Sequence, residues 1–166
     1  MYRAVVLFLF AVVWVLAPPG ALAEPVPPAG SVLLAAPLPG PTVTRPFDVL
    51  PSRYAPGHRG VDLAGAPGAP VLAAGDGVVA FAGMVAGRPV VSVDHPGGLR
   101  TTYEPVDPSV GAGQPVARGS PLGTLLAGHA GCPNSACLHW GLRRGEDYLD
   151  PLALLAVPRV RLLPLH

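Results

Sequence analysis

The 166-residue sequence contains no lysine, which excludes any function that carries a cofactor on a lysine amine. Charged residues are also few, at 13%, and the formal net charge is +1 with the histidines neutral. So small an excess of charge gives no electrostatic basis for capturing nucleic acid or an anionic membrane surface. Only two cysteines are present.

The N-terminal segment has the pattern of an export signal. The basic tripeptide Met1-Tyr2-Arg3 is followed by a continuous apolar run from Ala4 to Leu16, and Ala21-Leu22-Ala23 is the small-x-small pattern that signal peptidase recognises. The apolar run is shorter than the roughly 20 residues that span a bilayer, which argues against an uncleaved anchor. We expect a signal peptide over residues 1–23, a secreted product and no stable membrane insertion after cleavage.

The two cysteines, Cys132 and Cys137, are separated by four residues that include Pro133 and Asn134. Proline and asparagine favour a turn, and an exported protein meets an oxidising compartment in which thiols pair. We therefore expect a Cys132–Cys137 disulfide. Closing so short a loop contributes about 2 kcal/mol, so its expected role is to shape the loop locally.

The rest of the chain divides into three parts. Residues 24–41 are rich in Pro and Ala without periodicity, which is typical of a linker. Residues 42–153 are expected to form one folded domain, and residues 154–166 form an apolar tail with no readable role. One domain is what a chain of this length supports.

Within the folded part, short β-branched runs alternate with Gly or Pro, which predicts an all-β protein built from hairpins. The clearest hairpin has Val91 and Val93 alternating with polar residues, a turn at Pro96-Gly97-Gly98 and a return strand over residues 99–103. No segment has the pattern of a three-turn helix. The one short helical candidate is residues 151–156.

Two histidines and one aspartate are the candidate metal ligands. His58 and Asp62 lie in "APGHRGVDLAG" and would be about 13 Å apart in an extended strand, so a bend at the glycines must bring them together. Alone, this pair is more typical of a surface hydrogen bond. Adding His139, from "CLHWG", gives two imidazoles and one carboxylate, which with a fourth position open to water is the arrangement of a catalytic zinc site.

The segments "GHRGVDLAGAPGAPVLAAGDGVV", "VSVDHPGGLRTTY", "GQPVARGSPLGTL", "CLHWGLRRG" and "YLDPL" occur in the order and spacing of a known family. Over residues 43–153 the chain resembles the lysostaphin and LytM type zinc endopeptidases, which cleave peptide cross-links in bacterial peptidoglycan. The resemblance implies a two-sheet antiparallel β-fold with a groove, Zn²⁺ on His58, Asp62 and His139, and peptidoglycan peptides as partners at the cell wall. Lipoyl and biotinyl carriers have hairpins of similar shape but need the lysine that this chain lacks.

Two positions depart from the family pattern. Active members carry a histidine two residues before the last ligand, which helps to activate the attacking water, and here that residue is Cys137. A second histidine, two residues after the hairpin tyrosine Tyr103, is replaced by Pro105. Neither a disulfide-bonded cysteine nor a proline transfers protons, and loss of such assistance costs about 10²- to 10⁴-fold in rate.

Glu104 and His129 are the candidates that could replace the two missing histidines. We interpret Glu104 as a solvated carboxylate on an edge strand, and His129 as a loop residue that packs or hydrogen-bonds near the disulfide. The position of His95 is typical of a hairpin turn, and the terminal His166 is expected to be unstructured. Tyr103 is typical of a packed strand residue, although its side chain could also line the groove.

Two questions stay open at this level. Cys137 is paired with Cys132 or is instead a fourth zinc ligand, which would make a closed, inert site. The protein is an exported zinc endopeptidase, with full or weakened catalysis, or a non-catalytic module that binds peptidoglycan or regulates another cell-wall hydrolase. The sequence does not decide whether substrate is turned over.

Overall fold

The computed structural model describes residues 33–52 and 54–155. The predicted signal peptide, the first part of the predicted linker and the tail after residue 155, with His166, lie outside the described residues. No helix in the described part of the chain is long and apolar enough to cross a membrane.

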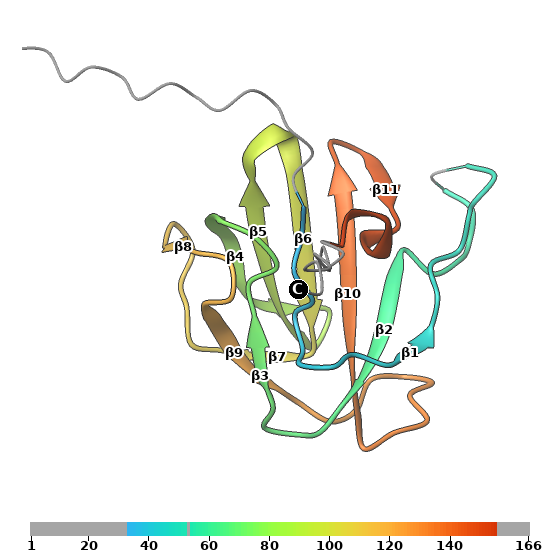
Figure 1. Cartoon of the computed structure of the whole chain (residues 1–166). Coiled ribbons are helices and arrows are strands. Elements are labelled where there is room, and N and C mark those ends of the chain that lie inside the picture. The colour runs from blue at the N-terminus through green and yellow to red at the C-terminus, as the bar shows by residue number, and fades with distance from the viewer. Residues whose placement is uncertain (1–32, 53, 156–166) are drawn as a thin grey trace, which may run out of the picture.

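The described part of the chain is nearly all strand, which confirms the predicted all-β class (Figure 1). The strands are β1 (Val43–Arg45), β2 (Gly60–Gly65), β3 (Pro70–Leu72), β4 (Gly77–Val85), β5 (Arg88–His95), β6 (Leu99–Glu104), β7 (Val106–Pro108), β8 (Pro115–Val116), β9 (Pro121–Leu125), β10 (Ala136–Arg144) and β11 (Asp147–Leu149). Two short 3₁₀ turns, η1 (Pro96–Gly98) and η2 (Pro151–Leu154), complete the elements, and η2 matches the one predicted helical stretch.

The strands form two antiparallel sheets. The larger sheet has the order β1-β2-β10-β6-β5-β4-β8, with β11 also paired to β10, and the smaller has the order β3-β9-β7. Buried side chains from both sheets make one core, of which the largest are Trp140 and Tyr103. This is the two-sheet architecture that the family resemblance implies.

The predicted hairpin is confirmed as β5, η1 and β6. Val91 pairs with Tyr103 and Val93 with Thr101, so the apolar residues of both strands share the core face. Gly97 and Gly98 have φ of 75° and 72°, a conformation that glycine adopts without the steric cost of a Cβ.

Part of the predicted linker belongs to the folded domain. Leu34 and Leu38 are buried in the core, and the Leu34 N–H donates to the Leu154 carbonyl at 2.7 Å. The linker prediction is therefore wrong from Leu34 to Leu38. Its composition reflected the surrounding prolines and alanines, whereas the two leucines cover apolar surface at the end of the core.

Candidate metal centre

The register of two neighbouring strands places two of the three predicted ligands side by side. β10 runs between β2 and β6, and His139 lies directly opposite Asp62 on β2. Directly opposed residues in an antiparallel pair point to the same face with Cβ atoms about 5 Å apart. The register of β2 and β10 thus brings together two side chains that are 77 positions apart in the chain.

His58 enters the site from the turn that precedes β2. Its backbone N–H donates to the Asp48 carboxylate at 2.8 Å, and the Asp48 N–H donates to the His58 carbonyl at 3.0 Å. The ring nitrogen Nδ1 lies 2.7 Å from the Pro46 carbonyl oxygen, which only accepts. His58 Nδ1 therefore carries the hydrogen, and in the neutral ring Nε2 presents its lone pair to the site.

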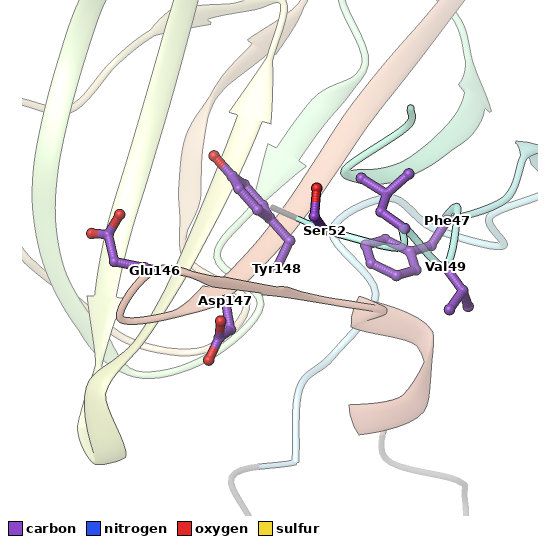
Figure 2. A pocket seen from close by; sticks show the side chains of 7 residues that line it. Phe47, Val49, Ser52, Glu146, Asp147 and Tyr148 are labelled. Atoms are coloured by element: carbon purple, nitrogen blue, oxygen red, sulfur yellow. The ribbon is translucent and has the colours of Figure 1, made fainter. Parts of the chain in front are cut away.

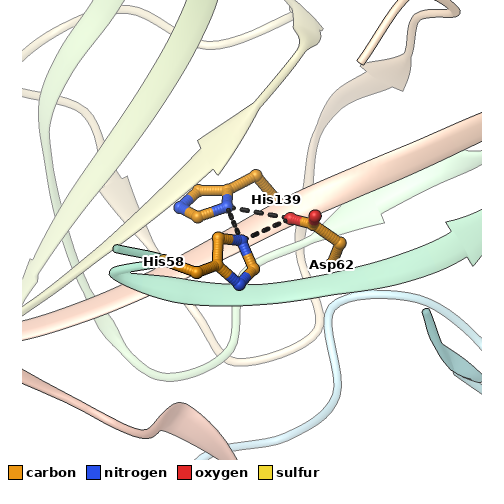
Figure 3. Close-up of side chains that lie close together, drawn as sticks. All are labelled: His58, Asp62 and His139. Carbon is orange, nitrogen blue, oxygen red and sulfur yellow. Dashed lines mark hydrogen bonds and ion pairs between the residues drawn. The ribbon is translucent and has the colours of Figure 1, made fainter. Parts of the chain in front are cut away.

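Three donor atoms converge at one point (Figure 3). His58 Nε2 and His139 Nδ1 each lie 2.9 Å from the same oxygen of Asp62, Oδ1, and 3.0 Å from each other. The side chains of His58, Asp62 and His139 are 7%, 5% and 18% exposed. Among the described residues, these three form the set whose ligand atoms are close enough to hold one metal ion.

The donor set fits Zn²⁺. With His58 Nε2 unprotonated, its lone pair faces a lone pair of Asp62 Oδ1 at 2.9 Å. A single hydrogen on His139 Nδ1 does not satisfy both of these acceptor atoms. A cation between the atoms removes this conflict. Zinc takes imidazole nitrogen and carboxylate oxygen at about 2.0–2.2 Å, which in tetrahedral geometry separates ligand atoms by about 3.3 Å. The observed separations of 2.9–3.0 Å are slightly shorter than this value, and small rotations of the side chains would remove the difference.

Asp62 is ionised at any physiological pH. Burial of the carboxyl opposes ionisation, but the hydrogen bond with His139 and the nearby His129, His58 and His139 rings lower the pKa of Asp62 to about 2. A charged oxygen ligand is therefore available without a proton having to be displaced first.

His129 is a loop residue that hydrogen-bonds near the disulfide, as expected, since the Cys132 N–H donates to its carbonyl at 3.2 Å, but its side chain also contacts the metal set. Its Nε2 lies 3.1 Å from Asp62 Oδ1, its ring stacks on His139 at a centroid distance of 5.9 Å, and the side chain is 13% exposed. It stands outside the three-residue ligand set. The sequence does not predict the contact between His129 and Asp62, because a loop and not a strand pairing brings the two side chains together.

The structure contains the Cys132–Cys137 disulfide that the sequence predicts. Cys137 is fully buried, lies opposite Ala64 in the strand register, and its Sγ is 3.6 Å from Thr44 Oγ1. A sulfur bonded to sulfur offers no thiolate, so the alternative in which Cys137 is a fourth zinc ligand does not hold in this structure.

Glu104 also differs from its interpretation as a solvated group on an edge strand. It ends β6, which lies between β5 and β10 in the middle of the larger sheet, and it faces His139 in the register. Its side chain is only 14% exposed and lies 3.5 Å from Arg88. A partly buried carboxylate therefore stands beside the metal set, next to Pro105.

Tyr103 and His95 are buried residues with structural roles outside the metal set. Tyr103 is fully buried, and its hydroxyl accepts from Thr101 Oγ1 and the Ala74 N–H at 2.8 and 2.9 Å, while burial raises the pKa of Tyr103 to about 12. It packs in the core and does not line the groove. His95 ends β5 beside the predicted turn, but it is buried between the Asp76 carbonyl and the Thr101 hydroxyl.

Of two cavities in the described part of the chain, one includes the metal ligand His139. This cavity, of about 240 Å³, begins at His139 and continues along the face of β10 and β6. The other, of about 230 Å³, lies between the segment after β1 and the β10–β11 hairpin, with Phe47 and Val49 on one side and Glu146 and Asp147 on the other (Figure 2). Tyr148 lines both cavities.

Comparison with known proteins places this site in a family. Residues 56–151 match Peptidase family M23, and this range contains all three members of the metal set. Uncharacterized protein Rv2891 of Mycobacterium tuberculosis is 56% identical over 131 residues, which cover 76% of this chain and 53% of the relative. The chain thus spans about half the length of the curated relatives it matches.

Solved structures agree with the architecture. Helicobacter pylori Csd3 is 26% identical with a TM-score of 0.63, over 81% of this chain and 36% of that chain. A zinc containing peptidase from Vibrio cholerae is 25% identical with a TM-score of 0.62, over 73% of this chain and 39% of that chain. Lysostaphin, at 21% identity and a TM-score of 0.59 over 79% and 62%, shares the fold. The fold and the matched range together confirm the resemblance, and this chain belongs to Peptidase family M23.

Proposed function

We propose that the chain is an exported, zinc-dependent endopeptidase that acts on the peptide cross-links of bacterial peptidoglycan. The observation that carries this proposal is the convergence of His58 Nε2, Asp62 Oδ1 and His139 Nδ1 within 3.0 Å of one another in a family M23 domain. The zinc named for the Vibrio cholerae peptidase of this fold supports the choice of metal.

The three ligands would hold zinc, which when bound supplies a Lewis acid for the peptide carbonyl and for water. The chain's own contribution begins with orientation. The Pro46 carbonyl fixes the His58 tautomer, and the Asp48 carboxylate holds the His58 backbone. Partners of this kind, which orient a ligand ring, typically change metal affinity by 10- to 100-fold when they are removed.

We assign proton transfer to His129. Its Nε2 faces the Asp62 carboxylate at 3.1 Å, which orients the ring. With Nε2 held by the carboxylate, the ring would take a proton from water through its other nitrogen, Nδ1, and return it to the departing amine. Because hydrolysis of an amide requires both transfers, this role offsets the loss of the family histidines at Pro105 and Cys137.

The disulfide contributes to this arrangement. It ties Cys132 to β10 two residues before His139, and the Cys132 N–H donates to the His129 carbonyl at 3.2 Å. The loop that carries His129 is thereby fastened to the strand that carries the last metal ligand. The cysteine that replaces a family histidine thus positions a different histidine.

Digestion of purified, cross-linked peptidoglycan tests the proposal. We expect the protein, produced without residues 1–23, to release amines from the cross-links. This release should stop when zinc is chelated and resume when zinc is restored. His129→Ala should bind zinc and release far less. Absence of release under every zinc condition would contradict hydrolysis.

A second function rests on a specific observation. Both positions at which active relatives carry proton-transferring histidines hold residues without a base, Pro105 and the bonded Cys137. A non-catalytic module that binds peptidoglycan or regulates another cell-wall hydrolase would tolerate both changes. Sedimentation of the protein with insoluble peptidoglycan, without release of peptides, is the result that would favour it.

A further inference from the structure

We propose that the cavity beside His139 is a subsite for a carboxylate on the peptide substrate, and that Arg143 binds this carboxylate. The inference rests on the proposed function for the identity of the peptide, and its test is independent of catalysis. It names a substrate class: stem peptides that carry a free carboxylate near the cross-link.

The cavity begins at a metal ligand and ends at a guanidinium. His139, Gly141 and Arg143 occupy alternate positions of β10 and so point to the same face, and all three line the cavity of about 240 Å³. The Cα atoms of His139 and Arg143 are about 13 Å apart along the strand. Since an extended peptide advances about 3.3–3.6 Å per residue, this span corresponds to a side chain about three to four residues from the scissile bond.

Glycine at position 141 keeps this path open. A Cβ there would sit 3.6–3.7 Å from the Arg59 carbonyl oxygen, His139 Nε2 and Thr102 Cβ. One methyl group fits at ordinary contact distance, and a larger side chain would fill the floor of the cavity between the metal set and Arg143.

Arg143 lines the cavity, and the carboxylate on which its charge acts, Asp94, forms its close ion pair with Arg100. Arg143 Nη1 donates to the Gly145 carbonyl at 2.9 Å, which carries no net charge. Within the described ranges 33–52 and 54–155, no carboxylate lies within ion-pair distance of Arg143. The nearby Glu104 and Asp94 carboxylates are paired with Arg88 and Arg100.

The wall of the cavity includes polar groups that are held in place. Arg59 donates to the Ala55 carbonyl at 2.9 Å, and its guanidinium lies 5.4 Å above the Tyr148 ring. Thr102 adds a hydroxyl on the β6 side. An apolar side chain placed here would desolvate these groups without hydrogen-bonding them, which is costly. A carboxylate can accept from Arg143 in a paired, planar geometry, which is among the stronger hydrogen bonds in proteins.

Binding of an uncross-linked stem tetrapeptide tests the proposal, because this probe offers no cross-link to cleave. The fluorescein-labelled probe is prepared with free side-chain carboxylates and, separately, as primary amides, and its Kd for the purified protein is measured by anisotropy. A charge-assisted hydrogen bond at a solvent-accessible site predicts about tenfold tighter binding of the carboxylate form. Arg143→Gln should remove this preference, and Arg143→Lys should keep part of it.

Arg144→Gln is the matched control. It removes the same charge from the adjacent residue of β10, which is exposed and points to the opposite face, and it should leave the preference unchanged. Equal binding of both probes by the wild type, or equal losses in Arg143→Gln and Arg144→Gln, would overturn the subsite. Carboxylate preference in a protein that digests no peptidoglycan would refute the proposed hydrolysis while supporting the subsite.

Discussion

The substitution Gly60→Ala tests how tightly the strand register holds the metal set. A Cβ at Gly60 would lie 2.6 Å from the Trp140 carbonyl oxygen and 2.7 Å from Cε1 and Nε2 of the His139 ring, where ordinary contacts begin at 3.4 Å. The ring and the neighbouring backbone must therefore retreat by about 0.7–0.8 Å to restore normal packing.

The magnitude follows from this displacement. Overpacking of this kind costs about 1–3 kcal/mol of stability. A functional metal site tolerates deviations of only about 0.2 Å in its ligand distances, so we expect zinc affinity to fall by about 10- to 100-fold, the range found when a ligand loses its orienting partner. Titration of zinc against a chromophoric chelator measures the affinity, and thermal unfolding measures the stability.

Gly141→Ala is the control for this experiment. Gly141 is the register partner of Gly60 on β10, and its added Cβ would meet its neighbours at 3.6–3.7 Å, which is ordinary contact. We expect zinc affinity within about twofold of the wild type, because no ligand has to move. Wild-type zinc affinity in Gly60→Ala, or an equal loss in both variants, would refute the reasoning.

Three further predictions concern the loop, the disulfide and a buried histidine. His129→Ala should keep one zinc per chain by elemental analysis while peptide release falls about 10²- to 10⁴-fold; loss of the metal as well would make His129 a ligand. Reduction of the Cys132–Cys137 disulfide should lower the free energy of unfolding by about 2 kcal/mol in denaturant titrations, and an unchanged midpoint would contradict a stabilising role. Burial lowers the pKa of His95 below 6.5, so the unfolded chain binds the proton first, and stability is full above about pH 6.5 and declines below it. Thermal unfolding at pH 7.5 and 5.5 should show a larger loss in the wild type than in His95→Gln, and parallel losses would argue against this account.

The fold was largely predictable because its signals are local. Alternating apolar residues and the Pro96-Gly97-Gly98 turn specify the β5–β6 hairpin without reference to the rest of the chain. Leu34 and Leu38 were missed because their burial depends on core surface supplied by distant segments, which composition does not reveal.

The candidate site was predictable to the extent that the family pattern names its residues. The pattern predicts His58, Asp62 and His139, and the structure brings their ligand atoms together. The contact of His129 with Asp62 and the burial of Glu104 were not predicted for one physical reason: each depends on a long-range constraint. The disulfide loop carries His129 back to Asp62, and the sheet order places β6, with Glu104, beside β10. The sheet order has no local sequence signal, and the predicted disulfide does not by itself indicate that its loop contacts Asp62.

The replacement of family histidines by Cys137 and Pro105 need not abolish proton transfer in this chain. A third imidazole lies within 3.1 Å of the shared carboxylate, supplied by a loop and not by a strand. The distinction between an enzyme and a binding module therefore depends on whether His129 serves in catalysis.

Anomalous diffraction at the zinc absorption edge, from crystals of the protein grown with one equivalent of Zn²⁺, tests the central claim most directly. The account predicts one peak per chain, at about 2.0–2.2 Å from His58 Nε2, Asp62 Oδ1 and His139 Nδ1. A peak bound by other side chains, or no peak at these three atoms with zinc present, would contradict it.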